Sequence, residues 1–399
     1  MSSTYQSFTP PRRVLMGPGP SDVPERILQA MARPTIGHLD PAFIGLMDEI
    51  KELLRYAFRT ENRLTMPVSG PGTVGMETCV VNLVEPGDTV LVGINGVFGG
   101  RLREMVLRAG GKVVEVRAPW GRALDVEDVR RTLDEHPDVK VVAFVHAETS
   151  TGARTDAEAI ARVAREHGCL TLVDAVTSLG GSPVLTDAWG LDMVYSGSQK
   201  CLSCTPGLSP ITVSERAVER IRHRIRPVQS WFMDLNLVMA YWEGEGMQRA
   251  YHHTAPINPL YGLHEALLML YEEGLEQAWE RHKRMHLGLT AGLEALGLSF
   301  FVPEEERLWQ LNAIVVPEGV DEKKVRMQLL EEYQLEIGAG LGDMAGTIWR
   351  IGLMGYSARV ENVYHCVEAL GKTLQAQGWK ASVQEALEAV EVELASFTS

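Results

Sequence analysis

Two strand ends in the sequence carry side chains that can do acid–base and covalent chemistry. The apolar run Cys169–Asp174 ends in a carboxylate, and the next apolar run, DMVYS, leads through GSQK to Lys200. Parallel strands present their carboxyl ends at one edge of a sheet, where open α/β sheets bind ligands, so we expect Asp174 and Lys200 to lie together. An ammonium held between an apolar strand and the loop at 201–207 is desolvated, which favours the neutral, nucleophilic amine.

A glycine-rich stretch, SGPGTVGMET, precedes both of these strands. Its Gly70, Gly72 and Gly75 have the spacing G-x-G-x-x-G, which is found in dinucleotide-binding turns. A dinucleotide site also needs an acid at the end of the following strand to hold the ribose hydroxyls. Here that strand, residues 89–94, continues as GING without a carboxylate. The pattern therefore favours a different phosphate site over an NAD site.

The alternative is a helix N-terminus that holds a single phosphate through its free N–H groups. Pro71 removes one donor there and Thr73 adds a hydroxyl, while Gly75 has the place of a close helix-packing position. A phosphate cradle, an acid and a nucleophilic lysine at one sheet edge are the set that pyridoxal 5'-phosphate requires. The lysine forms a Schiff base, and the acid keeps the pyridine nitrogen protonated so that the ring withdraws electrons.

Further motifs occur in an order that resembles the class V pyridoxal-phosphate aminotransferases, and within them the alanine–glyoxylate/serine–pyruvate (serine–glyoxylate) group. The resemblance extends from about Met16 to Leu374 and implies the fold of the PLP-dependent transferases, fold type I. Its motifs are LMGPGPSDVP, SGPG, HAETSTG, LVDAVTSLGG, YSGSQK, YHHTAP and WRIGLMG.

The resemblance assigns roles to residues around the cofactor. Lys200 resembles the Schiff-base lysine and proton carrier, and Asp174 the partner of the pyridine nitrogen. The remaining residues are matched as follows: Thr149 approaches the phenolic oxygen; Gln199, Gly72 and Thr73 contact the phosphate; and Phe98 stacks on the ring in place of the family's usual Trp.

Two further groups are implied by the same resemblance. Tyr251 and Thr254 correspond to phosphate ligands that the neighbouring subunit supplies, which implies a homodimer with shared active sites. Arg350 matches the arginine that binds the substrate carboxylate, a task suited to its planar fork of donors. Thr149 and His38 are the other candidates for contact with substrate.

The implied function is a transaminase that moves the amino group of alanine or serine to glyoxylate or pyruvate. The implied mechanism is ping-pong, through aldimine and ketimine forms of the cofactor. Ureidoglycine–glyoxylate and pyridoxamine–pyruvate transaminases share the framework, so the donor stays open. A lyase or cysteine desulfurase on the same fold is a second class. Against it, Phe98 and Gln199 stand where a desulfurase commonly has His, and Cys366 lies mid-helix as a core residue and not as a mobile nucleophile. An NAD oxidoreductase and a cofactor-free binding protein explain fewer of these residues.

The arrangement of apolar runs predicts the elements that position these residues. Short β-branched runs alternate with amphipathic segments, which is typical of a doubly wound α/β domain with a mostly parallel sheet. From about residue 261 the pattern changes to long helices with a few short strands. We therefore expect an N-terminal arm at 1–20, a large cofactor-binding domain at 21–260 and a smaller α+β domain at 261–399.

Composition excludes several classes of partner. The formal net charge of −14 argues against nucleic acid and anionic membrane surfaces, and no apolar run reaches the roughly 18 residues of a membrane span. The five cysteines and the absence of a secretory signal in MSSTYQSFTPPRR suggest a reduced compartment, and we expect the cytoplasm. Cys201 and Cys204 form C-x-x-C without two further ligands, so no metal site is expected.

Overall fold

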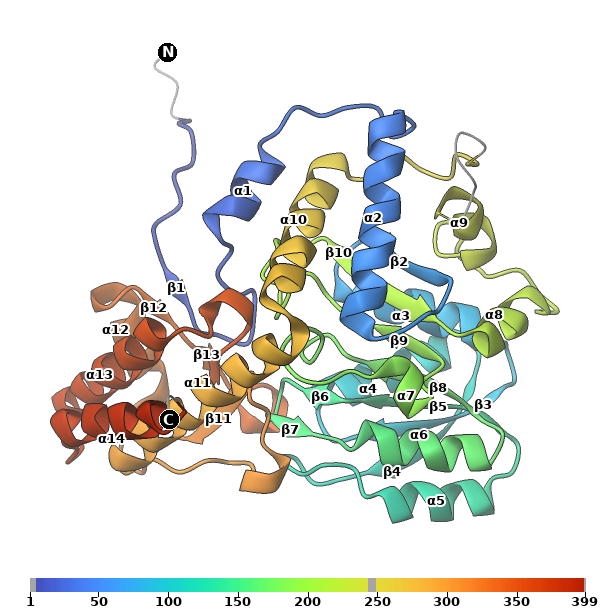
Figure 1. The fold of residues 1–399 in the computed structure, drawn as a ribbon. Coiled ribbons are helices and arrows are strands. Elements are labelled where there is room, and N and C mark those ends of the chain that lie inside the picture. Colours follow the sequence, from blue (N-terminus) through green and yellow to red (C-terminus); the bar gives the residue numbers. More distant parts are fainter. Residues whose placement is uncertain (1–4, 243–248, 398–399) are drawn as a thin grey trace.

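A seven-stranded sheet forms the centre of the larger part of the chain (Figure 1). The computed structural model describes residues 5–242 and 249–397. In spatial order the strands are β2 (Leu64–Ser69), β10 (Leu208–Val213), β9 (Met193–Tyr195), β8 (Leu170–Asp174), β5 (Val139–Val145), β3 (Thr89–Ile94) and β4 (Lys112–Arg117).

The sheet is parallel except at one strand. From β9 through β8, β5 and β3 to β4 every neighbouring pair is parallel, whereas β10 is antiparallel to both β2 and β9. Apart from the edge strand β4, these strands are almost fully buried, because helices cover both faces of the sheet. The predicted α/β fold with a mostly parallel sheet is confirmed, with the antiparallel β10 as an addition.

Ten helices of the described chain surround this sheet. The Asp156 side chain caps α6, accepting a hydrogen bond from the Ala159 N–H at 3.0 Å. The helices are α1 (Glu25–Met31), α2 (Pro41–Phe58), α3 (Gly72–Leu83), α4 (Val97–Arg108), α5 (Val126–Glu135), α6 (Ala157–Glu166), α7 (Thr186–Trp189), α8 (Glu215–Arg222), α9 (Leu235–Trp242) and α10 (Ile257–Glu273).

The C-terminal part is a smaller α+β unit beside the sheet (Figure 1). Its three-stranded antiparallel sheet has the order β11 (Leu311–Val315), β14 (Ile348–Gly352) and β13 (Gly338–Ala339). Its helices are α11 (Leu275–Ala295), α12 (Glu322–Glu332), α13 (Val360–Ala376) and α14 (Val383–Ala395). The long α11 packs along α14 and α13, and so it organises this unit.

The N-terminal arm is attached to the smaller unit. Its β1 (Val14–Leu15) pairs in parallel with β12 (Leu335–Glu336), and the Met16 side chain is fully buried in the core of that unit. The two hydrophobic cores meet along α11: Ala278 belongs to the core around the large sheet, and Met285 to the other. The boundary at residue 261 stays a prediction, and α10 beyond that residue packs into the first core.

The glycine-rich stretch forms the end of β2 and the start of α3. Gly75 lies on the face of α3 that packs on β10, where an added Cβ would come within 2.8 Å of the Ser209 Cβ. This position therefore serves the approach of helix to sheet, as the sequence predicts, since a larger residue would push the two elements apart.

Candidate active site

Asp174 and Lys200 lie together at the carboxyl edge of the large sheet. Asp174 is the last residue of β8 and pairs in register with Tyr195, the last residue of β9, and Lys200 follows five residues later in the chain. Both line a cavity of about 160 Å³. Its lining residues are Pro71, Gly72, Thr73, Met76, Phe98, Arg101, Ala147, Thr149, Asp174, Val176, Gln199 and Lys200.

The amine of Lys200 lies between the sheet edge and the N-terminal arm. Its Nζ donates a hydrogen bond to the carbonyl oxygen of Pro18. Gly19, with φ of +99°, leaves the space that the lysine occupies, because an added Cβ would lie 2.6 Å from Lys200 Cδ. Burial lowers the pKa of Lys200 to about 8, and the positive charge of Arg350 acts in the same direction. The N-terminal arm therefore contacts Lys200 through Pro18 and Gly19, which the motif LMGPGP alone does not reveal.

Two hydrogen bonds fix the carboxylate of Asp174. The Tyr195 hydroxyl donates to Oδ2 at 2.7 Å, and the Val176 N–H donates to Oδ1 at 2.9 Å. Only 2% of the residue is exposed, and this burial raises its pKa to about 6 although both hydrogen bonds oppose the rise. Sequence reasoning missed Tyr195, although it is the first residue of the YSGSQK motif and pairs in register with Asp174.

The start of α3 forms the end of the cavity that suits a phosphate. The first N–H groups of a helix have no carbonyl partner within it, and those of Gly72 and Thr73 begin α3 at the cavity. The Gln199 Oε1 is buried and lacks a hydrogen-bond partner among the described residues. An added Cβ on Gly72 would come within 3.3 Å of Val176 Cγ2. The orphaned Oε1 is an acceptor, so the groups that suit an anion with several oxygen atoms are the free N–H groups at the start of α3.

Two side chains hold the aromatic wall of the cavity, and sequence reasoning missed both. The Arg101 guanidinium lies 4.9 Å from the centre of the Phe98 ring and donates to Thr73 Oγ1 at 3.1 Å. The fully buried Glu148 accepts hydrogen bonds from the N–H groups of Phe98, at 3.1 Å, and Gly99, at 3.3 Å. Burial raises the pKa of Glu148. This carboxylate fixes the first turn of α4 and hence the place of Phe98.

Arg350 lies on β14, where the smaller unit meets the cavity. Its Nε donates to the Ala339 carbonyl at 2.7 Å, and its Nη1 donates to the carbonyl of Thr149 at 3.1 Å. Only 5% of the residue is exposed, and burial lowers its pKa to about 10. In the described chain no carboxylate lies within ion-pair distance of it. A buried guanidinium without an anionic partner is suited to bind a carboxylate from outside the chain.

Three predicted residues lie apart from this cavity in the single chain. The rings of His38 and Tyr251 contact each other at a centroid distance of 5.2 Å, and Tyr251 is 62% exposed. Thr254 is also exposed. None of the three lines the cavity at Lys200. Their roles stay predictions, as do the roles of the residues that the cavity brings together.

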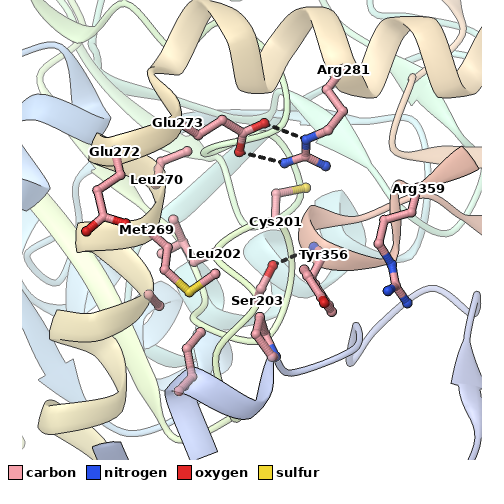
Figure 2. A pocket seen from close by; sticks show the side chains of 13 residues that line it. Cys201, Leu202, Ser203, Met269, Leu270, Glu272, Glu273, Arg281, Tyr356 and Arg359 are labelled. Atoms are coloured by element: carbon pink, nitrogen blue, oxygen red, sulfur yellow. Dashed lines mark hydrogen bonds and ion pairs between the residues drawn. The ribbon is translucent and has the colours of Figure 1, made fainter.

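A larger cavity, of about 440 Å³, lies next to the segment that follows Lys200 (Figure 2). Several of its polar groups already have partners: Arg281 forms a two-point ion pair with Glu273, and the Tyr356 N–H donates to Ser203 Oγ at 2.7 Å. Burial raises the pKa of the Cys201 thiol to about 12. Of these two cavities the smaller is the better candidate for the chemistry, because an acid, a lysine and a helix N-terminus meet there.

In residues 5–242 and 249–397, no group of three or more His, Cys, Asp or Glu side chains could hold a metal ion. The lysine, the paired acid and the helix start point instead to an organic cofactor with a phosphate group. The profile of the family described as aminotransferase class-V matches residues 14–358.

This chain belongs to the class-V aminotransferases. An alanine–glyoxylate aminotransferase of Drosophila melanogaster is 42% identical to it over 92% of this chain and 93% of that protein. A solved alanine–glyoxylate aminotransferase from Nostoc sp. is 48% identical, with a TM-score of 0.91 over 93% of this chain and 98% of that one.

The solved ureidoglycine–glyoxylate aminotransferase of Bacillus subtilis is 38% identical, with a TM-score of 0.94 over 97% of this chain and 99% of that one. The predicted family and the predicted fold type I are therefore confirmed. As a class-V aminotransferase the protein is a transaminase that depends on pyridoxal phosphate. The cavity at Lys200 fits that cofactor, since it offers an amine, a buried acid and the free N–H groups of a helix start.

Proposed function

We propose that this aminotransferase moves the amino group of a small L-amino acid, alanine or serine, to glyoxylate or pyruvate. The observation that carries the proposal is the buried Arg350, whose guanidinium forms no ion pair within the described chain and donates to the Thr149 carbonyl beside the cavity. A small monocarboxylate needs one such cation. The activity named for the Drosophila and Nostoc relatives supports the same choice.

We assign the residues of the cavity to the cofactor as follows. Lys200 would bind it covalently, Asp174 would face the pyridine nitrogen, and Phe98 would cover one face of the ring. Gln199, Gly72 and Thr73 would hold the phosphate, and Thr149 would approach the phenolic oxygen. When bound, the cofactor supplies a ring that withdraws electrons from the substrate Cα.

Lys200 is also placed to move the proton of the reaction. A group with a pKa near the working pH is an efficient acid and base, and burial brings the pKa of this amine to about 8. Transfer by such a positioned group contributes about 10²–10⁴-fold to rate. The contact with the Pro18 carbonyl holds the amine at the sheet edge and away from bulk water.

Replacing the substrate-binding cation tests the proposal directly. We expect Arg350→Gln to raise the KM for glyoxylate and pyruvate and to lower kcat/KM about 10–150-fold. The physical reason is that a hydrogen bond to a charged group contributes about 1.5–3 kcal/mol. Steady-state kinetics would measure this, with Arg326→Gln on α12 as the control, because that arginine pairs only with Glu322. An equal loss with an amine that lacks a carboxylate would contradict the role of Arg350.

A further amino-group donor should be tested in the same assays. The ureidoglycine–glyoxylate enzyme of Bacillus subtilis superimposes on nearly the whole chain, so (S)-ureidoglycine should be tested beside alanine and serine as a donor.

The desulfurase class is disfavoured, because all five cysteines are buried and burial raises the pKa of Cys366 to about 12. Release of sulfide from L-cysteine would revive it.

We propose a homodimer in which each chain completes the other's site. Tyr251 and Thr254 are exposed and lie outside the cavity of their own chain, as residues given to a partner would. We expect co-expressed Lys200→Ala and Tyr251→Ala/Thr254→Ala chains to regain about a quarter of wild-type activity, because half of a random mixture carries one intact site of two. Two inactive parents and an inactive mixture would contradict shared sites.

We further propose that the protein works in the cytoplasm. Across the described helices, none is both long and apolar enough to cross a bilayer. The acidic balance of the sequence and its five unpaired cysteines support the proposal, because disulfides are rare in the reducing cytosol.

A further inference from the structure

A third cavity, of about 380 Å³, lies beyond the short hairpin that carries Thr149. The hairpin consists of β6 (Ala147–Glu148) and β7 (Ala153–Arg154). The cavity shares no lining residue with the one at Lys200. Its lining residues are Ala123, Leu124, His146, Arg154, Thr155, Asp156, Ala157, Glu158, Ser182, Pro183, Trp189, Glu305 and Glu306.

Two polar side chains of this cavity lack the partners that their burial calls for. The Ser182 Oγ is buried without a hydrogen-bond partner among the described residues, and the residue is 2% exposed. The half-buried Arg154 faces no carboxylate within ion-pair distance in the described chain. Its guanidinium lies 5.5 Å from the centre of the Trp309 ring, and burial lowers its pKa. A cation and a hydroxyl left unsatisfied in one cavity suit the oxygens of a carboxylate.

The carboxylates at the same cavity divide into two kinds. Glu306 already binds the Arg122 guanidinium and the Ala123 N–H, and Asp156 caps α6. Glu158 and Glu305, by contrast, are exposed and form no hydrogen bond or ion pair with another residue that the structure describes. The cavity therefore offers a cation and a hydroxyl inside and two free carboxylates toward solvent.

We propose that this cavity is a second binding site, for a small zwitterion with one carboxylate and one ammonium group, the chemistry of a free α-amino acid. The carboxylate would bind Arg154 and Ser182, and the ammonium would face Glu158 and Glu305. The inference does not depend on the function proposed for Lys200, since it uses none of that cavity's residues.

The site is connected to the sheet edge through His146. The backbone N–H of His146 donates to the backbone carbonyl of Asp174 at 3.0 Å, and the ring Nδ1 of His146 lies 2.9 Å from Ser178 Oγ. The Thr155 N–H donates to the His146 carbonyl at 2.9 Å. Burial lowers the pKa of His146 to about 3, so the ring is neutral at physiological pH and forms an uncharged wall of the cavity.

Equilibrium dialysis of the holoenzyme with radiolabelled glycine tests this site. We expect wild-type protein and Arg350→Gln to bind glycine at the cavity, and Arg154→Gln to lower that affinity at least about 10-fold, because the charged hydrogen bonds are lost. Ser182→Ala is the second variant: it removes a hydroxyl that has no hydrogen-bond partner among residues 5–242 and 249–397, so we expect it to fold and to weaken binding. The exposed Arg162 of α6 lies outside the cavity, and Arg162→Gln is the matched control.

The outcomes separate the proposal from its rivals. Acetate and methylamine, each carrying one of the two charges, should bind more weakly than glycine. Glycine binding that is lost in Arg350→Gln and unchanged in Arg154→Gln and Ser182→Ala would place the ligand at Lys200 and overturn the proposal. Absence of glycine binding would overturn the proposal as well. Equal affinity for acetate and glycine would overturn the claim that the ligand is a zwitterion.

Discussion

Replacing Lys200 with alanine is expected to abolish transamination and, in the same variant, the visible absorption band of the lysine-bound cofactor. Both losses follow from one side chain, because the amine would bind the cofactor covalently and carry the proton. Proton transfer alone accounts for about 10²–10⁴-fold in rate. Turnover and the absorption spectrum of the reconstituted variant would be measured together.

The control for this variant is Lys140→Ala, which changes an exposed lysine of β5 outside the cavity. It should keep both the band and the activity. A Lys200→Ala protein that retains turnover with alanine would refute the assignment of Lys200. A variant that loses turnover but keeps the band would leave proton transfer to Lys200 and move the covalent bond elsewhere.

Asp174→Asn is the second change for which we expect a large effect. The asparagine keeps the shape of the side chain but removes the negative charge that would face the pyridine nitrogen. A charge-assisted hydrogen bond contributes about 1.5–3 kcal/mol, so we expect kcat to fall by at least about 10–150-fold. Steady-state kinetics and ¹⁵N chemical shifts of labelled cofactor would show whether the ring nitrogen has lost its proton.

Although Asp174→Asn is expected to lower kcat, we expect it to stabilise the cofactor-free protein at neutral pH. Burial raises the pKa of Asp174 to about 6, above its usual value of 3.8, so the folded protein binds more protons than the unfolded chain between these values. Stability of the apoprotein therefore falls as the pH rises from about 4 to about 6 and stays low above that range. We expect apo Asp174→Asn to have a higher Tm than apo wild type at pH 7–8 and no such advantage at pH 4. A lower Tm at pH 7 would contradict this account of Asp174.

The sequence predicts the strands of the large sheet well, because each is a short apolar run between turn residues. The predicted limits of residues 89–94 agree with β3, and the predicted run Cys169–Asp174 differs from β8 by one residue at its start. The direction of β10 could not be predicted, since an apolar run has the same pattern in a parallel and an antiparallel strand. Residues 41–58, which form α2, were not singled out as a helix, although Asp40 and Pro41 mark its start.

In the candidate site, too, residues that follow from the strand pattern could be predicted, and residues that act through tertiary contacts could not. Asp174 and Lys200 could be placed together because each ends a strand, and parallel strands share an edge. Glu148 could not be found, because its partners are backbone N–H groups of α4 fifty residues earlier in the chain. Tyr195 and Arg101 act through contacts across strands and helices that only the folded chain creates. The unsatisfied Ser182 hydroxyl is likewise a property of packing.

The measurement that tests the central claim most directly is the absorption spectrum of the pure holoenzyme before and after addition of L-alanine. We expect the visible band of the lysine-bound cofactor to fall as the near-ultraviolet band of the pyridoxamine form rises. Addition of glyoxylate should then restore the first spectrum. A protein that shows no visible band after reconstitution with pyridoxal phosphate, or a band that alanine and serine leave unchanged, would contradict the function proposed here.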